Sequence, residues 1–164
     1  MATRADWMDL DSARTELLVI WLSGGGALFL ILTVQSIFGR YGTELQSVWS
    51  WFIPNILPTL SLMVGVIGAT ALSSTAQQPK RVKRGFFRLS RALSIFYLAL
   101  IALTIMLEPF TKIPVLELYT SSNYFLGPIQ GLAVAALGVL FVTQDSPKGG
   151  TREKVELADP SRKG

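Results

Sequence analysis

Charged residues are absent from four long stretches of the chain: residues 17–39, 45–79, 92–107 and 118–144. A helix that crosses the hydrocarbon core of a bilayer needs about 20 predominantly apolar residues. Helices of soluble proteins carry polar residues on one face in every turn, and these stretches do not. The pattern therefore predicts an all-α membrane protein with four transmembrane helices packed as a bundle.

The expected organisation has three parts. Residues 1–16 mix apolar and acidic positions and form an interfacial segment, residues 17–143 form the membrane domain, and residues 144–164 form a flexible tail. The third charge-free stretch is short, but long basic side chains at its start can extend to the interface while their stems stay apolar. We place the spans at about residues 17–38, 54–74, 86–107 and 124–142.

Prolines set the expected starts of the second and fourth spans. Proline is tolerated in the first turn of a helix, so we expect span two to begin near Pro54, with Pro58 in an early turn and residues 44–52 along the outer interface. The alternative is a helix broken by Asn55 and Pro58 at membrane depth, as transporters use around a binding site. In the fourth span, Asn123 is the expected N-cap and Pro128 lies in the first turn.

The placement of basic residues predicts the orientation. The chain carries a net charge of +4. Basic residues cluster before the first span, between the second and third, and after the fourth, whereas the other two connections hold only Arg40 and Lys112. This is the positive-inside pattern, so both termini are expected in the cytosol and the protein in the plasma (inner) membrane. A charge distribution of this kind does not indicate nucleic-acid binding.

The residue inventory limits the chemistry. The sequence has no Cys and no His, which removes the usual ligands of zinc, haem and iron–sulfur clusters and the usual catalytic triads. The spans contain no charged residue away from their ends, which disfavours a proton relay. We therefore expect no enzyme activity, no metal and no cofactor.

Small residues recur at helical spacing in two spans. Such stripes let helix backbones approach closely in a membrane, either within one protomer or between copies, and the spacing does not decide between these. The expected packing residues are Ser61, Gly65, Gly68, Ala69 and Ser73 in span two, and Gly127, Gly131, Ala135 and Gly138 in span four.

A basic segment precedes the third span. Arg81, Arg84, Arg88 and Arg91 fall within about a quarter turn of a helical wheel, which predicts an amphipathic helix that runs into the span. We expect these arginines to contact anionic lipid headgroups at the cytosolic face. An acidic partner or a phosphorylated ligand remains an alternative.

Three consecutive glycines, Gly24, Gly25 and Gly26, lie inside the first span. Membrane helices tolerate glycine where a neighbouring helix packs closely, and this is the first interpretation. The second is a pivot, to which Pro54 and Pro58 of span two also contribute.

These features favour a non-enzymatic assembling, structural or anchoring subunit of a membrane complex or homo-oligomer. The expected partners are membrane lipids and further membrane subunits. An alternative is a channel gated through the basic segment, and a weaker one is a small-solute transporter with its site at a broken second helix.

Overall fold

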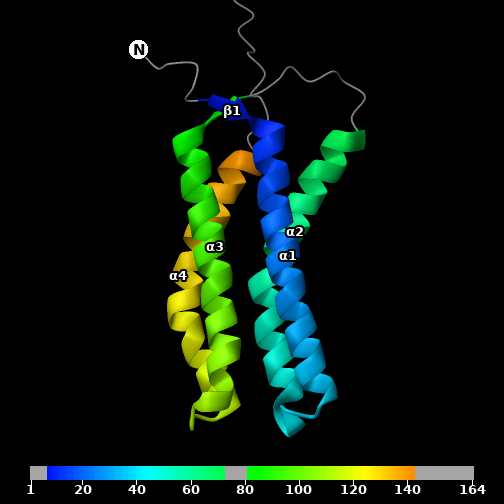
Figure 1. Ribbon diagram of the computed structural model, residues 1–164, viewed down its shortest axis with the longest axis vertical. Helices are drawn as coiled ribbons and strands as arrows, with labels where there is room; N and C mark the ends of the chain where they lie inside the picture. The colour runs from blue at the N-terminus through cyan, green and yellow to red at the C-terminus, as the bar shows by residue number, and fades with distance from the viewer. Residues whose placement is uncertain (1–6, 73–80, 143–164) are drawn as a thin grey trace, which may run out of the picture.

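The computed structural model describes residues 7–72 and 81–142 of the chain. Within these residues, four long helices lie side by side as a bundle (Figure 1). Each is long and apolar enough to cross a membrane, which confirms the predicted number and order of the candidate spans. They are α1 (Leu10–Ile37), α2 (Leu45–Leu72), α3 (Arg84–Leu107) and α4 (Val115–Val142).

The helices alternate in direction along the chain. Figure 1 shows the α1–α2 and α3–α4 connections at one end of the bundle, and these contain the short 3-10 helices η2 (Gly42–Glu44) and η3 (Glu108–Phe110). We call this the turn end. Helix α1 packs against α2 and α3, and α4 packs against the same two helices, so α1 and α4 lie mainly across the bundle from each other.

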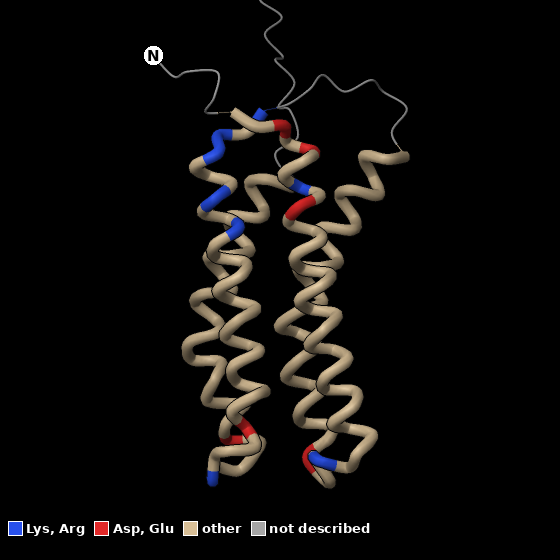
Figure 2. Tube along the Cα trace, viewed as in Figure 1, with Lys and Arg blue, Asp and Glu red and all other residues tan. Residues whose placement is uncertain are grey.

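A short ribbon closes the other end, which we call the ribbon end. Strand β1 (Trp7–Asp9) pairs antiparallel with β2 (Arg81–Lys83), with Trp7 opposite Lys83 and Asp9 opposite Arg81. The ribbon corrects two expectations: the described part of the chain is not entirely helical, and Arg81 lies in a strand rather than in the helix that carries the other arginines. Charged residues gather near the two ends of the bundle and leave its middle uncharged (Figure 2).

Large side chains fill the centre of the bundle. Trp21 and Tyr97 are both fully buried, and their rings stack in a tilted arrangement with centroids 5.8 Å apart. Met63 of α2 and Leu126 of α4 are also fully buried. The core is therefore built from all four helices, and the burial of these side chains holds the protomer together.

Helix α2 begins nine residues before the expected start. It begins at Leu45, so Pro54 and Pro58 lie inside the helix, and the segment expected along the interface is helical from Leu45 onward. Pro58 has no N–H to donate to the carbonyl of Pro54, four residues earlier. Gln130 Nε2 of α4 donates to that carbonyl at 3.3 Å. A neighbouring helix thus supplies the hydrogen bond that Pro58 removes, and α2 continues through this proline.

Helix α4 also begins earlier than expected. It starts at Val115, directly after Pro114, and the N–H of Leu118 donates to the Pro114 carbonyl at 3.0 Å. Asn123 and Pro128 lie inside the helix, so the prediction of Asn123 as the N-cap was wrong. Glu117 lies just before the charge-free stretch, so residues 115–117 were not counted in the predicted span. An acidic residue is nevertheless favourable in the first turn of a helix.

Candidate functional site

The small residues of α4 face away from the protomer's own core. Gly127, Gly131 and Ala135 are exposed, and Gly138 is half-buried. A Cβ atom placed on any of the three glycines meets no atom of a neighbouring residue within 4 Å. We call these four residues the α4 small-residue face. It makes no close helix contact within the described protomer.

The corresponding residues of α2 are similarly placed. Ser61, Gly65 and Ala69 are exposed, Gly68 is half-buried, and a Cβ on either glycine again meets no neighbouring atom within 4 Å. Ser73 lies outside the described residues.

The last turns of α2 lean away from the bundle. The last buried residue of α2 is Met63, and the end of the helix leans away from the other helices in Figure 1. The α2 stripe therefore does not serve packing inside the described protomer.

The consecutive glycines of α1 have different surroundings. A Cβ on Gly24 would lie 2.9 Å from Leu98 Cδ1 of α3, and a Cβ on Gly25 would lie 3.2 Å from Ile56 Cγ2 of α2. Gly26 has no such neighbour within 4 Å. Helix α1 continues without interruption through all three. Gly24 and Gly25 thus permit close approach of α1 to two neighbouring helices.

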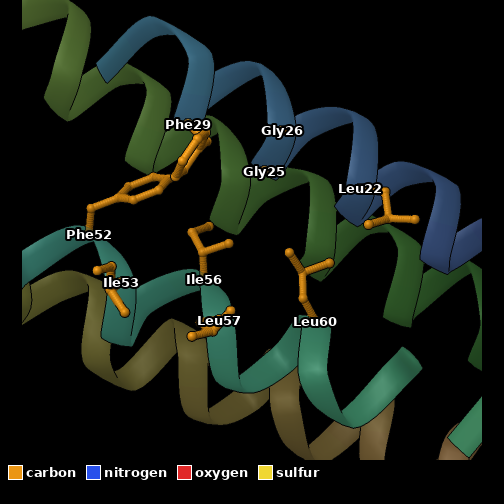
Figure 3. A pocket seen from close by; sticks show the side chains of 9 residues that line it. All are labelled: Leu22, Gly25, Gly26, Phe29, Phe52, Ile53, Ile56, Leu57 and Leu60. Atoms are coloured by element: carbon orange, nitrogen blue, oxygen red, sulfur yellow. The ribbon is translucent and has the colours of Figure 1, made fainter. Parts of the chain in front are cut away.

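An apolar groove of about 350 Å³ runs between α1 and α2 (Figure 3). Gly25 and Gly26 form part of its α1 wall, and Phe52, Ile56 and Leu60 belong to its α2 wall. Every residue that lines the groove is apolar or glycine. The groove offers hydrocarbon contact and no group for acid–base or metal chemistry.

A polar cluster links three helices inside the bundle. The Tyr97 hydroxyl of α3 contacts both the backbone carbonyl and the side-chain Oδ1 of Asn55, at 3.0 and 2.9 Å. Asn55 Nδ2 donates to the Trp51 carbonyl at 2.7 Å, and Trp51 Nε1 donates to Ser122 Oγ of α4 at 3.0 Å. These bonds satisfy buried polar groups and join α2 to α3 and to α4.

Arg14 has a role that the sequence analysis missed. It is 5% exposed, and its Nε and Nη2 atoms donate to the carbonyls of Leu140 and Phe141 at 2.8 and 3.2 Å. A cation at the carboxyl end of a helix compensates the carbonyls left without helical partners. The available signal was spacing: Arg14 shares a helix face with the buried residues Leu17 and Leu10.

Ion pairs connect the helices near both ends. At the turn end, Arg40 Nε lies 2.9 Å from Glu108 Oε2. At the ribbon end, Arg91 Nη1 of α3 lies 2.8 Å from Glu16 Oε1 of α1. Burial raises the pKa of Tyr41 at the turn end, and its neutral hydroxyl donates to Gln35 Oε1.

Among the described residues, no three or more His, Cys, Asp or Glu side chains lie close enough together to hold a metal ion. The features that remain are surfaces: the two outward small-residue faces, the apolar groove and the exposed arginines at the ribbon end. Comparison of the chain with protein-family models, with curated proteins and with solved structures finds no match.

Proposed function

We propose that this chain is a non-enzymatic membrane subunit that assembles with further copies of itself through the α4 small-residue face. The observation that carries the proposal is the position of Gly127 and Gly131: both are exposed, and a Cβ added to either would meet no neighbouring atom within 4 Å. Association in lipid depends on close van der Waals packing, and small residues four apart permit it.

The α2 small-residue face supports the same function. Beyond Met63, no described residue of α2 is fully buried in its own protomer, and only Val66 and Ile67 pack partly against the core. A helix from another copy, seated against Gly65 and Ala69, would bury this end. The α2 and α4 faces lie on helices that pack against each other.

The proposed setting is the plasma membrane, with the ribbon end in the cytosol. Arg84, Arg88 and Arg91 lie at the ribbon end, whereas Arg40 at the turn end is paired with Glu108. Basic residues near the ends of spans favour the cytosolic side.

Two alternatives have less support. Helix α2 is continuous through Asn55 and Pro58, so it does not form the broken helix expected of a transporter site. Trp21 and Tyr97 fill the centre of the protomer, which disfavours a conduction path along its axis.

The test compares two substitutions on α4. Gly131→Ile adds bulk to the small-residue face, where the protomer has room for it, so it should leave helix content unchanged and convert the assembled form to monomer. Leu132→Phe adds bulk at an exposed position at the edge of that face and should leave the assembly intact. Mass in a mild detergent and energy transfer between labelled copies in liposomes report association.

A wild-type chain that is monomeric in both assays would contradict the proposal. Equal association of the wild type and the Gly131→Ile variant would show that the α4 small-residue face is not part of the interface.

A further inference from the structure

The arginines at the ribbon end differ in their surroundings. Arg91 is engaged by Glu16 at 2.8 Å, and Arg81 is the register partner of Asp9 in the ribbon. Arg84 and Arg88 are exposed, and neither has an ion-pair partner among residues 7–72 and 81–142. These two arginines therefore hold charge that the described chain does not balance.

An exposed apolar strip continues directly from this pair. Ala92, Ile95 and Ala99 are exposed and follow Arg84 and Arg88 along α3 toward the middle of the bundle. At 100° per residue, all five positions fall within about 80° of one another around the helix. One face of α3 is thus basic at the ribbon end and apolar below it.

The ribbon places a further basic group and an aromatic ring at the same end. Lys83 directly precedes α3, and its Nζ lies 5.9 Å from the centroid of the Trp7 ring. Tryptophan beside basic residues is typical of the boundary between headgroups and hydrocarbon. Pairing of β1 with β2 holds Lys83 and the start of α3 beside this ring.

We propose that Arg84 and Arg88 bind the phosphate of an anionic phospholipid, with an acyl chain along Ala92, Ile95 and Ala99. Guanidinium groups recognise phosphate oxygens through paired hydrogen bonds. The apolar strip favours a lipid over a soluble phosphate, because only the lipid covers both parts of the face. The inference rests on the membrane setting proposed above and is independent of self-association.

The experiment uses the purified full-length protein in a mild detergent. Native mass spectrometry compares retention of phosphatidylglycerol with that of phosphatidylcholine carrying the same acyl chains. The wild type should retain phosphatidylglycerol preferentially. Arg84→Gln or Arg88→Gln should each weaken this retention about fivefold, and the double substitution about thirtyfold, because each basic residue near an anionic lipid contributes a similar increment.

Three further variants sharpen the result. Lys112→Gln removes one exposed positive charge at the turn end and should not change retention. The double change Arg84→Lys with Arg88→Lys preserves the charge but loses the paired hydrogen bonds, so it should keep only part of the preference, more than the double glutamine variant does. Glu16→Gln releases Arg91 and should strengthen retention, which a damaged fold would not do.

Two outcomes would overturn the proposal: equal retention of both lipids by the wild type, or unchanged preference in the Arg84 and Arg88 double variant. Full competition by glycerol phosphate, which lacks acyl chains, would assign the arginines to a soluble ligand and overturn it as well. Gly131→Ile should bind the lipid as the wild type does. A loss of preference in that variant would instead place the lipid between protomers and contradict the α3 site.

Discussion

Tyr97 and Asn55 show how a polar pair is accommodated in an apolar interior. Tyr97 is fully buried and Asn55 is 7% exposed. Each finds hydrogen-bonding partners in the other helix or its own backbone, at distances between 2.7 and 3.0 Å. An unpaired polar group at such a site is costly, so we expect the hydroxyl of Tyr97 to contribute to the free energy of unfolding beyond the packing of its ring.

Tyr97→Phe should lower the free energy of unfolding by about 1–3 kcal/mol, because the Asn55 amide oxygen loses its donor while remaining buried. The matched control is Tyr124→Phe, which makes the same chemical change at a side chain that is 86% exposed. Reversible unfolding in mixed detergent measures both. Equal effects of the two substitutions would show that the buried hydroxyl contributes no net stability.

At this scale, the sequence predicts which residues share a face but not where that face points. The spacing of Gly127, Gly131 and Ala135 placed them together on one side of a helix, and they lie together. Their outward direction depends on how α4 packs against α2 and α3, which helical spacing does not contain. The partners of Gly24 and Gly25 were hidden for the same reason, since they come from distant segments.

The number and order of the long helices followed from the charge-free stretches, whereas the starts of α1, α2 and α4 did not. Helix α1 begins at Leu10, within the segment expected along the interface. A proline was taken as the start of α2, yet that helix begins at Leu45. Gln130, which is 76 residues away from Pro54, donates to the Pro54 carbonyl that Pro58 leaves without a helical partner. Rules based on local sequence place helix starts poorly where a neighbouring helix compensates the proline.

Helix α4 ends against a side chain from α1. Replacement of Arg14 by methionine keeps much of the side-chain volume but removes the charge and the two hydrogen bonds to Leu140 and Phe141. We expect Arg14→Met to lower the free energy of unfolding by about 1.5–3 kcal/mol, the range for hydrogen bonds from a charged donor.

The control for Arg14→Met is Lys112→Gln, at an exposed position, which should change stability by less than about 0.5 kcal/mol. Unfolding followed by circular dichroism measures both variants. A loss no larger than that of the control would mean that water replaces the guanidinium at the end of α4.

For the whole molecule, orientation is testable because the chain contains no cysteine. Thr43 lies in η2 at the turn end, and Thr75 lies between α2 and α3 in sequence. We expect Thr43→Cys to react with an impermeant maleimide in intact cells, and Thr75→Cys to react only after permeabilisation, as the distribution of basic residues predicts. The opposite labelling pattern would invert the proposed topology.

The overall arrangement was predictable only in part. Four helices joined by short connections imply antiparallel neighbours, and the structure has them. The ribbon was not predicted, because a strand of three residues such as Trp7–Asp9 carries too little periodicity to be recognised. The spacing of the arginines had also predicted a helix where its partner strand β2 lies.

The ribbon restricts how many times the chain between its two strands can cross a membrane. Backbone hydrogen bonds between β1 and β2 require residues 7–9 and 81–83 to lie on the same side of any membrane that the helices cross. The intervening chain must then cross an even number of times, whichever way the charges direct it. Helices α1 and α2 satisfy this as a closed pair, so neither can change orientation alone while the ribbon stays paired. An insertion error in the first hairpin would therefore leave β1 unpaired. A chain with Met8→Cys and Val82→Cys would then fail to form the disulfide crosslink that the paired ribbon allows.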